Sequence, residues 1–108
     1  MPYYLLQAAY TSEGVAALVK KPQDRIKVVG SAAEKLGGKV HGGWFAFGDY
    51  DVIAIIEMPD NVSAAGLSMA FAAGGALRTV KTTPLLTVDE ATKAMRKAAG
   101  TAYRPPTR

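Results

Sequence analysis

The sequence predicts an α+β fold of the ferredoxin-like type, a βαββαβ unit with a four-stranded antiparallel sheet and one additional C-terminal helix. Four stretches rich in aliphatic, β-branched and aromatic residues are typical of strands, namely 3–10, 39–47, 50–58 and 78–86. Segments of helical periodicity separate the first strand from the second and the third from the fourth. Only Gly48 and Asp49 separate the second strand from the third. This order is that of the split βαβ unit, whose strands lie in the order 4-1-3-2 (4132).

The segment between the first two strands predicts two helices. Thr11 and Ser12 can cap a helix over 13–20. Pro22 suits the first position of a second helix, because an N–H group is not needed there. Apolar residues then recur at helical spacing along that second helix, at Ile26, Val29, Ala33 and Leu36. Gly37 and Gly38 are expected to end it, since glycine accepts the left-handed conformation of a helix C-cap.

The second half of the chain predicts a tight hairpin and two more helices. Gly48-Asp49 suits a two-residue type II′ turn. Asp60 is expected to cap a helix whose interior, 62–75, is almost free of charge and rich in small residues. Thr87 and Glu90 have the spacing of a capping box. The helix that follows carries one apolar stripe, at Val88, Ala91, Met95 and Ala98, and is expected to end at Gly100.

Length and composition favour one small domain over 1–100 with a flexible basic tail over 101–108. Hydrophobic residues make up 49% of the 108 residues, which at this size suggests surface shared with a second copy. The net charge of +4 favours a solvated surface over a nucleic-acid patch. The chain has no cysteine, no run long enough to span a membrane and no signal-peptide pattern, so a cytoplasmic location is expected.

A two-residue turn at Gly48-Asp49 would fix the register of the hairpin. One face would then carry Trp44 opposite Ile53, Ala46 opposite Asp51 and Val40 opposite Glu57. The other face would carry Phe45, Val52, Ala54, Ile56, Phe47, Tyr50 and His41. Both faces are apolar, so both should be covered, one by the chain's own helices and the other by a second copy. A slip of one residue would exchange the two faces.

The face with Trp44 is expected to hold the ligand-binding residues. The strand order brings Asp51, Tyr10 and Arg78 to one rim, where Asp51 and Arg78 can also form a purely structural ion pair. Gln7 and Lys81 are expected near mid-strand on neighbouring strands. Trp44 is expected either to pack in the interface or to line a pocket for a flat ligand. The predicted ligand-binding set is therefore Tyr10, Trp44, Asp51, Arg78, Gln7 and Lys81.

Two residues are candidates for acid–base catalysis. Glu57, expected near Tyr3 and Tyr4, is either a general base with a pKa raised by burial or a carboxylate hydrogen-bonded at the strand end. His41, the only histidine, is a candidate lone proton acceptor. No set of residues has metal-ligand spacing, and the Gly-rich end of the third helix lacks the lysine of a phosphate loop, so neither metal nor cofactor is expected.

Several of these motifs also resemble those of a known family. The turn residues Gly48, Tyr50 and Asp51, followed by a strand that ends in Glu57, Pro59 and Asp60, are similar to the signature of GYD-domain proteins. The segments 10–14, 35–40 and 77–82 match as well, so the resemblance extends over about 3–95. It implies a dimeric α/β barrel, in which the sheet of one chain packs against the sheet of a second copy.

Three functions are compatible with this sequence. The first is a homo-oligomeric module that binds a small aromatic or lipophilic molecule in the inter-subunit barrel. The second, by analogy with other dimeric α/β barrels, is a cofactor-independent oxygenase, isomerase or decarboxylase acting on a small aromatic or lactone. Its acid–base groups would come from His41, Glu57, Asp51 or Tyr10. The third is an RNA-binding sheet, which ranks last because the aromatic RNP pattern is missing.

Overall fold

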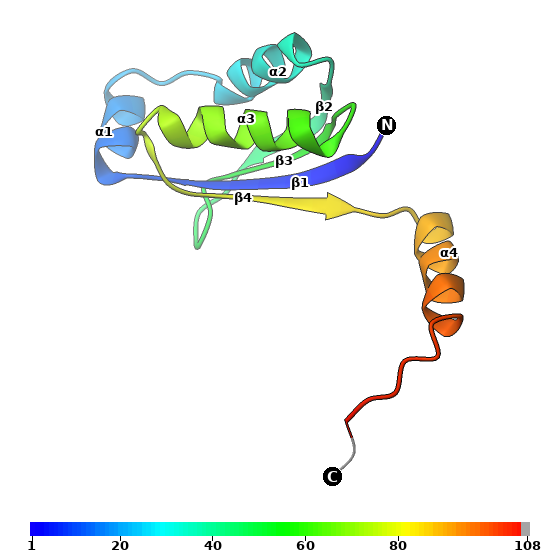
Figure 1. Ribbon diagram of the computed structural model, residues 1–108. Helices are drawn as coiled ribbons and strands as arrows, with labels where there is room; N and C mark the ends of the chain where they lie inside the picture. Colours follow the sequence, from blue (N-terminus) through cyan, green and yellow to red (C-terminus); the bar gives the residue numbers. More distant parts are fainter. Residues whose placement is uncertain (107–108) are drawn as a thin grey trace.

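The computed structural model describes residues 1–106 and contains the predicted order of elements with an additional C-terminal helix (Figure 1). The elements are β1 (Tyr3–Tyr10), α1 (Ser12–Lys20), α2 (Arg25–Lys35), β2 (Lys39–Phe45), β3 (Val52–Glu57), α3 (Asn61–Ala73), β4 (Leu77–Leu85) and α4 (Val88–Ala99). All neighbouring strands are antiparallel, and the sheet order β2-β3-β1-β4 confirms the predicted ferredoxin-like topology.

Most helix ends follow the capping signals of the sequence. The Thr11 hydroxyl accepts a hydrogen bond from the Gly14 amide at 3.0 Å, and the Asp60 carboxylate accepts one from the Ser63 amide at 2.7 Å. At the start of α4, Thr87 and Glu90 satisfy each other's backbone N–H groups in the predicted capping box. These caps fix where α1, α3 and α4 begin.

Helix α2 begins three residues later than the sequence pattern indicated. Pro22 lies in the linker, and the helix starts at Arg25 because the Asp24 carboxylate accepts hydrogen bonds from the amides of Ile26 and Lys27. The prediction that Pro22 is the first helical residue is therefore wrong. The end of α2 is as predicted, with Gly37 at φ +83° and the Gly38 amide donating to the carbonyl of Ala33.

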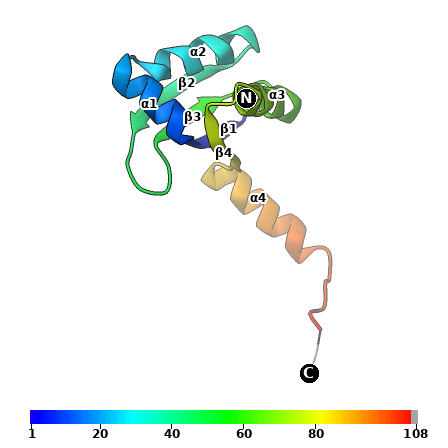
Figure 2. The same ribbon diagram turned by 90° about the vertical axis from the view of Figure 1, so that its left-hand side faces the viewer.

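The hydrophobic core lies on one side of the sheet, beneath α2 and α3. Leu6, Ile56, Met58 and Leu67 are its largest fully buried side chains. Figures 1 and 2 show α2 and α3 on this side, whereas α4 projects away from the rest of the domain. We call this side of the sheet the covered face and the opposite side the open face.

The β2–β3 connection is longer than the predicted two-residue turn. β2 ends at Phe45 and β3 begins at Val52, so residues 46–51 lie outside the strands. The Ala46 amide still donates to the Asp51 carbonyl at 2.7 Å, which confirms their predicted opposition. The connection bends away from the helices towards the open side, so Phe47 is fully exposed and its predicted place beneath the helices is wrong (Figures 1 and 2).

Candidate functional site on the open face

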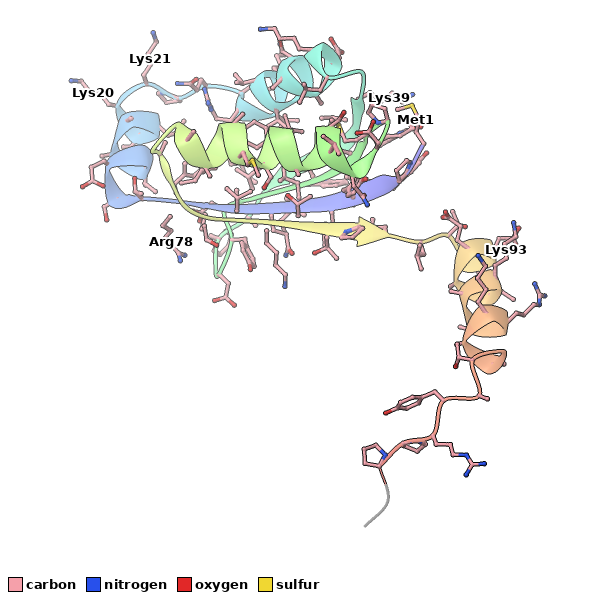
Figure 3. All side chains as sticks on the ribbon, in the orientation of Figure 1. Met1, Lys20, Lys21, Lys39, Arg78 and Lys93 are labelled. Atoms are coloured by element: carbon pink, nitrogen blue, oxygen red, sulfur yellow. The ribbon has the colours of Figure 1, made fainter. Side chains whose placement is uncertain are left out.

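The open face is a largely apolar surface with a few polar groups. Its residues alternate with the buried ones along β3 and along residues 3–8 of β1, and the strand pairing extends this face to β2 and β4. None of the helices in residues 1–106 covers it (Figures 1 and 3). The regularly paired residues of the open face are Tyr3, Leu5, Gln7, Trp44, Ile53, Ile55, Glu57, Lys81, Thr83 and Leu85. Gln7 lies at its centre, where the register places it between Ile53 and Lys81. The predicted positions of Gln7 and Lys81 are thereby confirmed.

Trp44 is the most prominent aromatic residue of the open face. It opposes Ile53, as the sequence predicted, and its side chain is 59% exposed. Its ring lies over Gly42, because a Cβ atom at that position would stand only 2.8 Å from the Trp44 Cη2 atom. The indole therefore covers a neighbouring glycine and presents its other side to solvent, where a flat molecule or a second chain can contact it.

A β-bulge in β2 changes which face His41 occupies. The pairing of Gly42 with Ile55 follows the predicted register, but Val40 pairs with Ile56 and Lys39 with Glu57, which leaves His41 as the extra residue. Val40 therefore packs against the core, and His41 lies on the open face. Both predictions, Val40 opposite Glu57 and His41 beneath the helices, are wrong. The bulge packs the partly buried valine against the core and leaves the imidazole accessible.

The bulge joins the two catalytic candidates in one polar pair. His41 Nε2 lies 2.7 Å from Glu57 Oε1, and this is the one side-chain ion-pair contact found within residues 1–106. The Tyr3 ring stacks on the imidazole with the ring centroids 4.8 Å apart. The sequence predicted that Tyr3 lies near Glu57, but it did not predict that His41 contacts either residue. Gly42 and Gly43 were the available signal, since glycine inside a strand often marks a bulge.

The hydrogen bond to His41 also decides between the two alternatives for Glu57. It is the largest cause of the lowered pKa of Glu57. Desolvation by burial acts in the opposite direction but is outweighed by this hydrogen bond together with the nearby positive charges. A general base with a pKa raised by burial is therefore not what this carboxylate provides. Glu57 is ionised at neutral pH, and its carboxylate can orient the imidazole of His41 through the 2.7 Å contact.

The rim at the other end of the sheet holds Asp51 and Arg78, but not as a salt bridge. The Asp51 carboxylate accepts a hydrogen bond from the Tyr10 backbone N–H at 2.9 Å. The Arg78 guanidinium donates to the Asp49 carbonyl at 3.2 Å, and Figure 3 shows it on the side away from α2 and α3. No ion pair between Asp51 and Arg78 forms among the described residues. Both side chains fix the β2–β3 connection.

Tyr10 is placed differently from the rest of the predicted set. Its side chain lines a pocket between the sheet, α2 and α3, together with Arg25. The prediction that Tyr10 faces the barrel is therefore wrong, because residues 6, 8 and 10 of β1 share the covered face. The sequence did not identify Arg25 as a site residue, because nothing in its pattern distinguishes it from the other Lys and Arg residues of the chain.

Other classes of site are poorly represented in the described part of the chain. Residues 1–106 contain no group of three or more His, Asp or Glu side chains that could hold a metal ion. None of their helices is long and apolar enough to cross a bilayer. Of the basic residues labelled in Figure 3, Lys20 and Lys21 lie together at the end of α1, whereas Lys39, Arg78 and Lys93 lie in separate parts of the molecule.

Comparison with known proteins identifies the family. The family model of the GYD domain matches residues 4–95. The chain is also similar to the glutamine synthetase and cystathionine β-lyase binding protein of Thermus thermophilus, with 30% identity over 81 residues. That match covers 74% of this chain and 84% of the relative. The motif around Gly48, Tyr50 and Asp51, the ferredoxin-like topology and these matches lead to one conclusion: this protein belongs to the GYD-domain family.

Proposed function

We propose that this protein is a homo-oligomeric binding module, in which the open face packs against that of a second copy and encloses a site for a small aromatic or lipophilic molecule. The observation that carries the proposal is the open face itself. Leu5, Ile53 and Ile55 lie at its centre, and Trp44 is 59% exposed beside them. A contiguous apolar surface of this kind on a small chain marks an interaction site.

The polar groups of the open face define what the enclosed site would recognise. Stacked sheets lie about 10 Å apart, so apolar side chains from both copies would exclude water from the space between them. The Lys81 ammonium and the Gln7 amide would then require partners, since buried polar groups are costly without hydrogen bonds. An aromatic or lipophilic body with at least one acceptor atom satisfies both requirements.

The projecting helix α4 also supports self-association. Every residue of α4 is exposed or partly exposed, with Val88 84% and Met95 67% exposed along the predicted apolar stripe. A helix with such a stripe gains stability chiefly by packing it against another surface. In the proposed oligomer, α4 packs on the second copy.

A second candidate function is the binding of another protein. Its support is the relative from Thermus thermophilus, which is named for binding glutamine synthetase and cystathionine β-lyase. In this alternative the open face receives an enzyme in place of a second copy. A cofactor-independent enzyme is a third alternative, supported by the His41–Glu57 pair. It predicts a loss of turnover, with the fold retained, in both Glu57→Gln and His41→Ala.

Sedimentation velocity tests the proposal. The wild-type chain should sediment as a dimer or a larger oligomer at micromolar concentration. Ile55→Lys puts a charge at the centre of the open face and should give a folded monomer. Val62→Lys puts the same charge on the exposed side of α3 and should leave the oligomer intact. A wild-type monomer that retains its fold at all concentrations would overturn the proposal and favour the protein-binding alternative.

A further inference from the structure

We propose a second ligand site, on the covered face and within a single chain, that binds a small monocarboxylate with a single-ring aromatic or branched aliphatic body. The site is a pocket of about 190 Å³ between the sheet, α2 and α3. It lies on the opposite side of the sheet from the open face, so it does not depend on self-association.

The walls of this pocket are apolar. Leu6, Ala8 and Val52 form its floor on the sheet, Val28 and Val29 line it from α2, and Phe71 lines it from α3. Beside Phe71 and Leu77, the lining on the α3 side consists of the small residues Ala70, Gly74 and Ala76, which leave space for the pocket. Apolar cavities of about 150 Å³ are known to bind benzene. The volume therefore suits one ring or a short branched chain.

Two polar side chains give the pocket its chemical preference. Tyr10 and Arg25 both line it, and Arg25 is the first residue of α2. Burial raises the pKa of the Tyr10 hydroxyl above its ordinary value, while the nearby Arg25 guanidinium acts in the opposite direction. The hydroxyl therefore stays protonated at neutral pH and can donate a hydrogen bond. The guanidinium remains charged throughout the physiological pH range.

The charge of Arg25 is available to a ligand. Its guanidinium donates to the Gln23 side-chain carbonyl at 3.0 Å, which orients it without neutralising it. Within the described residues no carboxylate forms an ion pair with it. Asp51 also acts on Tyr10, but its carboxylate is held by the Tyr10 backbone N–H. A carboxylate that accepts from Arg25 and Tyr10 complements this site, with its apolar body directed inward.

NMR titration of the full chain with benzoate tests this site, with benzyl alcohol as the uncharged probe of similar size. Benzoate should shift the amides of Ala8, Val29 and Phe71, and it should leave those of Leu5 and Ile55 unchanged. Arg25→Gln should weaken benzoate binding roughly tenfold or more, the usual effect of losing a hydrogen bond to a charged group. Lys27→Gln removes a positive charge from the exposed side of the same helix and should leave benzoate affinity unchanged.

A variant whose larger side chain fills the pocket provides the second test of ligand binding. Ala70→Leu should abolish binding of both probes in a chain whose amide spectrum remains folded. The monomeric Ile55→Lys variant should still bind benzoate, which separates this site from the proposed self-association. Absence of benzoate shifts up to its solubility limit, shifts confined to the open face, or equal affinity of wild type and Arg25→Gln would each overturn the proposal.

Discussion

The two faces of the sheet are both apolar, yet they are built differently. β3 shows this within six residues, because Val52, Ala54 and Ile56 are buried beneath the helices, whereas Ile53, Ile55 and Glu57 face the open side. The covered face is closed by α2 and α3, whose Ala33, Ala64 and Leu67 are buried against the sheet. The open face carries long aliphatic and aromatic side chains together with Gln7, Lys81 and the His41–Glu57 pair. The covered face therefore holds the core of the chain, whereas the open face is the surface that we propose packs against a second copy.

The largest difference between the faces should appear when adjacent leucines of β1 are truncated. Leu6→Ala leaves a cavity in the core and should lower the free energy of unfolding by about 2–5 kcal/mol. Leu5→Ala, on the open face, should cost clearly less when it is measured in the monomeric Ile55→Lys background. Urea denaturation of both variants makes the comparison. Equal losses would show that the open face is already part of the intrachain core.

A smaller effect is expected from removing matched helix caps. Asp60→Ala removes the cap of α3 and should lower the free energy of unfolding by about 1 kcal/mol, because α3 closes the core. Thr87→Ala removes the cap of α4 and should lower the helical signal in circular dichroism.

The two cap variants compare α3, which packs on the core, with α4, which projects from the domain. In the monomeric background, Thr87→Ala should move the urea midpoint less than Asp60→Ala does, since α4 lies away from the core (Figure 2). In the wild-type oligomer the effect of Thr87→Ala should grow. An effect that is the same in both backgrounds would contradict the packing of α4 on a second copy.

The smallest effect should come from the pH dependence of the His41–Glu57 pair. The pKa of Glu57 is lowered in the folded chain, so its stabilising contribution is present above the ordinary value of 4.5 and is lost as the pH falls through the lower folded value. Glu57→Gln should therefore lower the melting temperature slightly at pH 7 and leave it unchanged near pH 3. Glu34→Gln, on the exposed side of α2, is the matched control. A difference that grows towards low pH would contradict the assigned pair.

The parts of the fold that depend on local signals could be predicted from the sequence. Thr11, Asp60 and Thr87 cap their helices with hydrogen bonds to nearby amides, and Gly37 adopts the positive φ that ends α2. These features need no knowledge of distant residues. The strand order also followed, because the sequence of elements permits few topologies.

The candidate site could be predicted only in part, because the extra residue of the β2 bulge, His41, moves to the open face. Trp44, Gln7 and Lys81 lie where alternation placed them. Gly42 and Gly43 are a local sign of a bulge, but they do not place its extra residue at His41. That position depends on distant contacts, because Val40 packs against the core while the imidazole reaches Glu57. The pocket beside Arg25 depends on the separation of α2 and α3, which periodicity does not report.

The concentration dependence of Trp44 fluorescence tests most directly whether the open face is covered by a second copy. Trp44 is the only tryptophan, so its emission reports this surface alone. Coverage by a second copy should give a blue-shifted emission maximum at high protein concentration, a red shift on dilution, and a red-shifted maximum at every concentration in Ile55→Lys. A solvent-exposed spectrum of the wild-type chain at every concentration would contradict it.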